Sequence, residues 1–135
     1  MTLIDLQLPD EQAARLDRFA SSVRKSRGEA TAQLIEEALR HEEFPSVEFR
    51  DSVVGRQPYV VGSSLAVWEV SMVAETYVLD SGKTAKHLGW PPQRAEGVLA
   101  YIRAYSAEVL PLVAENDAVS EEDLRRRLPM ALWTP

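Results

Sequence analysis

Residues 55–105 read GRQPYVVGSSLAVWEVSMVAETYVLDSGKTAKHLGWPPQRAEGVLAYIRAY, and the rest of the chain is organised around this stretch. A glycine- and proline-rich extended piece precedes an apolar helical segment at 67–79, a short helical segment at 83–88, a turn at Gly89-Trp90 and a longer helix from Pro92. This is the order of a helix-turn-helix unit. Gly89 suits the turn because glycine adopts a left-handed backbone at little cost. Pro92 suits a first helical turn, where its missing N–H costs nothing.

Both longer helices of this unit carry apolar side chains at steps of three and four residues. The positions are Val67, Val70, Val73/Ala74 and Tyr77 in the first helix and Ala95, Val98, Leu99, Ile102 and Tyr105 in the last. This spacing predicts that each helix buries one stripe, against the small helix that carries Ala85 and Leu88. A packed core explains the pattern without any function; contact of this unit with DNA is the second interpretation.

The composition describes one ordinary domain or two very small ones, because the chain has 135 residues. Its 45% hydrophobic and 27% charged residues are typical of a soluble globular protein. The absence of cysteine excludes disulfides, thiolate metal sites and cysteine catalysis. No apolar run has the length of a membrane span, and MTLIDLQLPD lacks the basic region and apolar core of a signal peptide. We therefore expect a cytoplasmic protein.

The charge balance is acidic, with a net charge of −6 and a sequence pI near 5.0. Residues 1–50 carry 7 basic and 10 acidic groups, residues 51–110 carry 5 and 6, and residues 111–135 carry 3 and 5. A protein that wraps nucleic acid usually shows a basic face. DNA binding would therefore come from a local patch on a dimer and would depend on salt.

The N-terminus predicts a strand followed by two helices. In residues 2–8, TLIDLQL, apolar side chains at 4, 6 and 8 share one face, which is the period of a strand. Asp10 is expected to cap a first helix, which ends at SVRKSRG (22–28). A second helix is expected from about 29 to 43. The residues that it should turn inward are Ala30, Leu34, Ile35, Ala38 and Leu39.

A lone strand leaves both of its edges unpaired and needs a partner. A symmetric dimer, in which two such strands pair antiparallel and four helices interlock, is the simplest solution. The motif L-P-x-E after the strand and S-R-G-E-A before the second helix resemble the ribbon-helix-helix family of small repressors and antitoxin N-termini. That resemblance covers residues 2–43.

The ribbon-helix-helix resemblance implies that the outward strand face enters the major groove and contacts base edges. Carried over by position, the base-contacting residues are Leu3, Asp5 and Gln7. The start of the second helix should hold the phosphate backbone through free N–H groups and the helix dipole. The anchoring residues are Arg24, Lys25, Ser26, Arg27 and Gly28. The alternative is a solvated loop that happens to carry three basic residues.

Residues 47–61 predict a small β-hairpin. Val47 and Phe49 alternate with Glu48 and Arg50, which indicates a short strand. A turn at Gly55–Pro58 is expected to lead into a second strand at Tyr59–Val61.

A second resemblance covers about residues 47–110. The pattern G-R-x-P-Y-V-x-G-[ST]-x-L-x-V-W-E-V, followed by H-L-G-W-P-P-x-x-A-E-x-x-L-A-Y, is similar to the family called domain of unknown function four-thirty-three. Members of that family are often antitoxins, similar to the VapB-type partners of PIN-like ribonuclease toxins. The positions that carry the resemblance are Gly55, Pro58, Gly62, Val67, Trp68, Leu88 and Leu99.

The C-terminal residues supply the candidate toxin contacts. Pro111 is expected to kink or restart the helix that follows Tyr105, and a capped helix should open at Ser120. PIN-like nucleases are expected to hold a divalent metal with carboxylates, which an inserted basic side chain would neutralise. The candidates are Arg125, Arg126 and Arg127, anchored by Leu128, Leu132 and Trp133. The alternative is a surface helix whose last turn is basic to suit its dipole.

These observations predict a mainly α protein with short β elements: a ribbon-helix-helix dimerisation and DNA-binding module at 1–44, a β-hairpin and trihelical helix-turn-helix-like module at 45–110, and a toxin-binding tail at 111–135. The expected function is that of a type II antitoxin which neutralises a PIN-like ribonuclease and represses its own operon by binding operator DNA as a homodimer. A stand-alone dimeric transcriptional regulator is the alternative. No enzyme is expected, and no cofactor, metal or membrane partner, because no catalytic or phosphate-binding spacing occurs.

Overall fold

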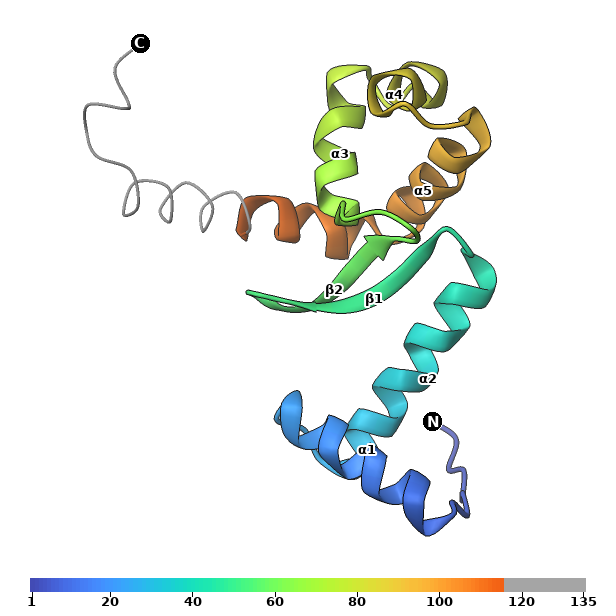
Figure 1. Cartoon of the computed structure of the whole chain (residues 1–135), viewed down its shortest axis with the longest axis vertical. Helices are drawn as coiled ribbons and strands as arrows, with labels where there is room; N and C mark the ends of the chain where they lie inside the picture. The colour runs from blue at the N-terminus through green and yellow to red at the C-terminus, as the bar shows by residue number, and fades with distance from the viewer. Residues whose placement is uncertain (116–135) are drawn as a thin grey trace, which may run out of the picture.

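The computed structural model describes residues 1–115 and is mainly helical, with one small β-hairpin (Figure 1). This confirms the mainly α class with short β elements. Its elements in chain order are α1 (Asp10–Ser22), α2 (Arg27–Glu43), β1 (Val47–Ser52), β2 (Gly55–Val60), α3 (Val67–Thr76), α4 (Ser81–Leu88) and α5 (Pro92–Ala104), followed by a helix at Ser106–Glu115. We call this last element the terminal helix.

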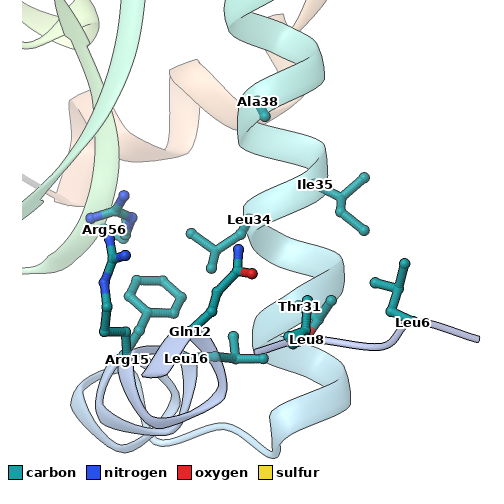
Figure 2. A pocket seen from close by; sticks show the side chains of 11 residues that line it. Leu6, Leu8, Gln12, Arg15, Leu16, Thr31, Leu34, Ile35, Ala38 and Arg56 are labelled. Carbon is teal, nitrogen blue, oxygen red and sulfur yellow. The ribbon is translucent and has the colours of Figure 1, made fainter. Parts of the chain in front are cut away.

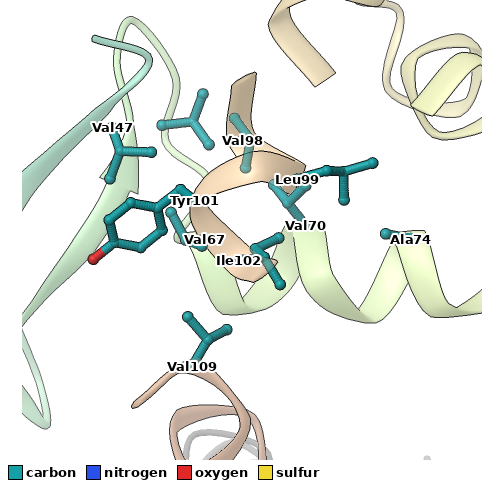
Figure 3. Packing of buried hydrophobic residues seen from close by; sticks show 10 residues of the cluster. Val47, Val67, Val70, Ala74, Val98, Leu99, Tyr101, Ile102 and Val109 are labelled. Atoms are coloured by element: carbon teal, nitrogen blue, oxygen red, sulfur yellow. The ribbon is translucent and has the colours of Figure 1, made fainter. Parts of the chain in front are cut away.

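The core lies where the hairpin meets the three helices α3, α4 and α5. Figure 3 shows branched side chains from α3 gathered around the end of α5. The buried cluster consists of Val47, Val60, Val67, Val70, Ala74, Val98, Leu99, Tyr101, Ile102 and Val109. The predicted stripes of α3 and α5 are therefore confirmed, and the hairpin adds one side chain from each strand. The terminal helix adds Val109, which is 1% exposed.

The hairpin turn lies elsewhere than the sequence predicts. We expected a turn at Gly55–Pro58 and a strand at Tyr59–Val61, but the turn consists of Val53 and Val54, and Gly55 pairs with Ser52. Gly55, the first residue of β2, has a φ of +109°, which only glycine adopts cheaply, so it lets the chain leave the turn into the strand. Pro58 is tolerated opposite Phe49 because both strands of a two-stranded sheet are edges.

The turn between α4 and α5 has the predicted geometry. Gly89 is left-handed, with φ +70°, and the Trp90 N–H donates to the Ala85 carbonyl at 2.8 Å. Pro92 is the first residue of α5. Together with the Gly89 N–H bond to the Lys86 carbonyl, this pattern is a Schellman motif.

Two other helices end in the same motif without glycine at the left-handed position. After α1, Arg24 has φ +55° and the Lys25 N–H donates to the Ala20 carbonyl at 2.9 Å. After α3, Val78 has φ +53° and the Leu79 N–H donates to the Ala74 carbonyl at 2.8 Å. A side chain in this conformation costs about 1–2 kcal/mol per residue. Both turns are therefore strained, whereas the Gly89 turn is not.

The two N-terminal helices begin at residues other than those expected. Asp10 is the first residue of α1, and Pro9, which has no side-chain donor or acceptor, occupies the cap. Helix α2 begins at Arg27 rather than 29. The reason is a capping box, in which Ser26 Oγ accepts from the Glu29 N–H and Glu29 Oε1 accepts from the Ser26 N–H, both at 3.1 Å.

The N-terminal segment, residues 1–9, forms neither helix nor strand in the single chain (Figure 1). A strand needs a neighbour, and neither strand of the hairpin pairs with this segment. The strand predicted at 2–8 therefore stays a prediction for the dimer.

The chain bends at Tyr105 rather than at Pro111, so the predicted kink position is wrong. Helix α5 and the terminal helix meet at 97°, and the terminal helix runs through Pro111 to Glu115. Val109 of the terminal helix is buried in the same core as Tyr101 of α5. In residues 1–115 no single helix is long and apolar enough to cross a membrane; α5 and the terminal helix meet that test only as a bent pair.

Candidate functional site

Residues 1–43, which we call the N-terminal half, expose large apolar side chains of the kind that normally lies in a core. The exposed fraction is 88% for Leu3, 69% for Ile4, 58% for Leu6, 47% for Ile35 and 52% for Leu39. Ile35, Ala38 and Leu39 were expected to turn inward, but all three are exposed, so that expectation is wrong for the single chain. Helix α1 is the one helix of residues 1–43 that packs against α2, so part of the surface of α2 stays open to solvent.

A hollow of about 490 Å³ lies between the N-terminal segment, α1 and α2. Figure 2 shows leucine side chains from all three segments around this hollow, with Gln12, Arg15 and Arg56 at its rim. The lining residues are Leu6, Leu8, Gln12, Arg15, Leu16, Phe19, Thr31, Leu34, Ile35, Ala38 and Arg56. We call this hollow, together with the exposed Ile4 and Leu39, the apolar face.

A second hollow brings together some of the predicted DNA-contacting residues. It has a volume of about 840 Å³, and Leu3, Arg27 and Gly28 all line it. Leu3 therefore shares a hollow with Ile4 and Leu6 instead of lying on the opposite face. Asp5 and Gln7 are exposed and line neither hollow.

Two of the three basic side chains at the turn into α2 already bind other side chains of the same chain. Arg27 donates to both carboxylate oxygens of Asp17, at 2.9 and 2.8 Å, and Lys25 Nζ donates to Gln33 Oε1 at 2.6 Å. The hydrogen bonds to Arg27 lower the pKa of Asp17, and the same pairing raises the pKa of Arg27. Within residues 1–115, Arg24 has no side-chain hydrogen bond or ion pair, so its guanidinium is the cation of this turn most available to an anion.

The helix start itself already holds a carboxylate. The Ser26 N–H donates to Glu29 Oε1, and this backbone bond lowers the pKa of Glu29. This internal anion sits where the resemblance places phosphate. Gly28 remains exposed, and a Cβ added there would meet nothing within 4 Å, so close approach of a ligand backbone is possible.

A buried arginine joins the N-terminal half to the rest, and the sequence analysis missed it. Arg40, in the last turn of α2, is 9% exposed. It donates to both oxygens of Glu108 in the terminal helix, at 2.6 and 2.9 Å, and to the hydroxyl of Tyr101 in α5 at 3.1 Å. Glu36 accepts from Nε at 3.1 Å, and the ring of Tyr105 lies 3.8 Å from the guanidinium carbon. The only sequence signal was the i, i+4 spacing of Glu36 and Arg40.

The electrostatics of this cluster favour the charged pair. Hydrogen bonds to Arg40 lower the pKa of Glu108, and bonds to Glu108 raise the pKa of Arg40. Burial raises the pKa of the Tyr101 hydroxyl, although Arg40 opposes this. A second arginine reinforces the joint, because Arg56 of β2 donates to both oxygens of Glu37 in α2, at 2.9–3.0 Å.

The two histidines have structural partners. His41 Nδ1 lies 2.8 Å from the Val47 carbonyl oxygen, and His87 Nδ1 lies 2.8 Å from the Tyr77 hydroxyl. In the described part of the chain, no group of three or more histidine, aspartate or glutamate side chains is placed to hold a metal ion.

The predicted toxin contacts Arg125, Arg126, Arg127, Leu128, Leu132 and Trp133 lie outside the described residues. Comparison of the chain with protein-family models, with curated proteins and with solved structures gives no match.

Proposed function

We propose that this protein is the antitoxin of a type II toxin–antitoxin pair, acting in the cytoplasm as a homodimer that binds its own operator DNA and neutralises a PIN-like ribonuclease. The observation that carries the proposal is the apolar face of residues 1–43, which the single chain leaves open to solvent. Large contiguous apolar surfaces on a folded chain mark interaction sites. The unpaired N-terminal segment beside this face supports a second copy as its partner.

Pairing of two N-terminal segments would satisfy both needs at once. The backbone groups of residues 2–8 would gain a ladder, and Ile4, Leu6 and Ile35 would gain a cover. The dimer would carry two turns of residues 24–28, one from each copy. Arg24 is the cation we expect to contact phosphate, because Arg27 is already paired with Asp17.

Operator binding is tested by gel shift on the DNA upstream of the gene, over a range of salt concentrations. Arg24→Gly is the most informative variant, because it removes the charge and also relieves the left-handed backbone. Its affinity should fall, and the salt dependence should decrease by about one counterion per arginine removed. Arg103→Ala, which removes an exposed arginine from α5, is the matched control and should bind like the parent. Equal binding by parent and Arg24→Gly would contradict the assigned phosphate contact.

The toxin arm is tested with the product of the neighbouring gene. That product should cleave RNA in the presence of Mg²⁺, and the full-length chain should abolish cleavage. A charge-reversed variant at Arg125, Arg126 and Arg127 should lose inhibition and keep operator binding. Inhibition that survives this variant would contradict the assigned toxin contacts.

A stand-alone dimeric regulator is the second candidate. It is favoured by the position of the apolar face, whose apolar side chains all lie in residues 1–43. Operator binding that is lost in Arg24→Gly, combined with no nuclease encoded beside the gene, would select this candidate over the antitoxin.

A further inference from the structure

Arg40 contacts side chains of both α5 and the terminal helix from its place on α2. It lies on α2, the helix that also carries Ile35 and Leu39 of the apolar face. Its guanidinium reaches Tyr101 on α5 and Glu108 on the terminal helix. It is the one buried charged side chain among the described residues.

The bend between α5 and the terminal helix lies directly against this guanidinium. Tyr105, the residue at the bend, places its ring 3.8 Å from the guanidinium carbon of Arg40. Glu108, one turn further, is held by two parallel hydrogen bonds, a geometry that fixes orientation as well as distance. Contacts with α2 therefore help to fix the direction of the terminal helix, which meets α5 at 97°.

We propose that the Arg40–Glu108 pair is a latch that couples occupancy of the apolar face on α2 to the direction in which the terminal helix leaves the core. The inference rests on the proposed function, since it gives that function a means of regulation: dimer formation would fix α2, and α2 would fix the start of the toxin-binding residues. Coupling of this kind is reciprocal, so a partner that moves the terminal helix would change dimer stability by the same factor.

A buried arginine suits such a latch because its charged guanidinium needs hydrogen-bond acceptors around it. With Glu108 in place, its donors and its ring contacts are satisfied from three helices. If Glu108 moves away, the guanidinium keeps two acceptors, Glu36 and the hydroxyl of Tyr101, and loses the two bonds that Glu108 accepts. The proposed latch therefore has a latched state, in which Glu108 binds Arg40, and an open state, in which Glu108 is released.

The absence of cysteine makes the angle directly measurable. Ala100 on α5 and Ala114 on the terminal helix are both exposed, so a double cysteine variant at these positions can carry two spin labels. The distance between the labels reports the bend, in full-length chain diluted with unlabelled protein. The latch is then opened by Glu108→Ala. Glu75→Ala is the matched control, because Glu75 is an exposed glutamate of α3 with no side-chain hydrogen bond or ion pair among residues 1–115.

In the parent and in Glu75→Ala we expect one narrow distance distribution, and in Glu108→Ala a shifted or broadened one. The dimer dissociation constant, measured by sedimentation, should rise about threefold or more in Glu108→Ala and stay unchanged in Glu75→Ala. An unchanged distance in Glu108→Ala would overturn the latch. A changed distance with an unchanged dissociation constant would overturn the coupling while leaving the dimer, and so the proposed function, intact. A parent that never dimerises would overturn both coupling and dimer, whatever the distances show.

Discussion

The two halves of this molecule use apolar residues in opposite ways. Around the hairpin, α3 and α5 bury Val67, Val70, Val98 and Leu99 to 0–1% exposure within one chain. In residues 1–43, the two α2 side chains Ile35 and Leu39 remain about half exposed, and the N-terminal segment exposes four more large apolar side chains, those of Met1, Leu3, Ile4 and Leu6. Helical periodicity is equally clear in both halves. The difference is that three helices and a hairpin surround one core, whereas α1 alone cannot cover α2.

This contrast shows that a single chain buries the apolar side chains around the hairpin but leaves those of residues 1–43 open to a partner. A helix pair with one uncovered side cannot bury enough apolar surface to offset the entropy of ordering it. The joint made by Arg40 and Arg56 ties that incomplete half to the complete one. We therefore expect the N-terminal half to stay folded in the single chain but to gain stability on association.

The largest expected difference in stability comes from replacing one leucine by alanine in each of the two halves. Leu99→Ala should lower the free energy of unfolding by about 2–5 kcal/mol at any protein concentration, because Leu99 is 1% exposed in the core. Leu39→Ala should have little effect on the dilute single chain and should weaken self-association instead, because Leu39 is 52% exposed. Chemical denaturation at two protein concentrations measures both. A large, concentration-independent loss in Leu39→Ala would show that the two halves are alike.

A smaller effect should appear in the acid range, at the joint between the halves. Arg40 lowers the pKa of Glu108 below its ordinary value of 4.5. Ionised Glu108 thus stabilises the fold above that pH, and this contribution disappears as the pH falls through the lowered pKa. Denaturation at pH 7 and in steps below pH 4.5 should show a loss in the parent that is diminished in Glu108→Gln.

The size of that acid effect is limited by solvent, since the Glu108 side chain is 57% exposed. Asp17 and Glu29 also have lowered pKa values and contribute in the same pH range, so only the difference between the two proteins reports the joint. Identical acid dependence in parent and Glu108→Gln would contradict the assigned pairing.

The smallest effects should come from the helix ends, and they have opposite signs. Val78→Gly should raise the free energy of unfolding by about 0.5–1 kcal/mol, since it relieves a left-handed valine at the cost of glycine's extra entropy. Gly89→Ala should lower it by about 1 kcal/mol through backbone strain alone, because a Cβ there meets nothing within 4 Å. Thermal unfolding of the two variants checks this. A destabilising Val78→Gly would mean that the exposed valine contributes a contact which the single chain does not contain.

Local signals predicted the features that local chemistry controls. Gly89 and Pro92 mark a helix end and a helix start, and the stripes of α3 and α5 follow from periodicity, because each depends on near neighbours in sequence. The hairpin turn was misplaced because Gly55 and Pro58 are usual turn residues, yet strand pairing put the turn at Val53-Val54. Tertiary pairing overrode the local preference.

The candidate site was predicted less completely, for two physical reasons. The positions of Ile35 and Leu39 depend on a surface that one chain does not supply, so periodicity assigned them to a core that is absent here. The partners of Arg40 lie 61 and 68 residues away, and no pattern near α2 indicates them. Residues 24–28 lie at the turn into α2, as predicted. The pairing of Arg27 with Asp17 and of Ser26 with Glu29 at this turn was not predicted.

The central claim is that the apolar face is completed by a second copy of the chain, and sedimentation of the full-length protein tests it most directly. The parent should form a dimer whose fraction falls on dilution, and Leu6→Asp, which places a carboxylate on the apolar face, should sediment as a monomer with the core around Leu99 intact by circular dichroism. A parent that remains a single copy at every concentration, with the amides of residues 2–8 protected from hydrogen exchange by its own chain, would contradict the account.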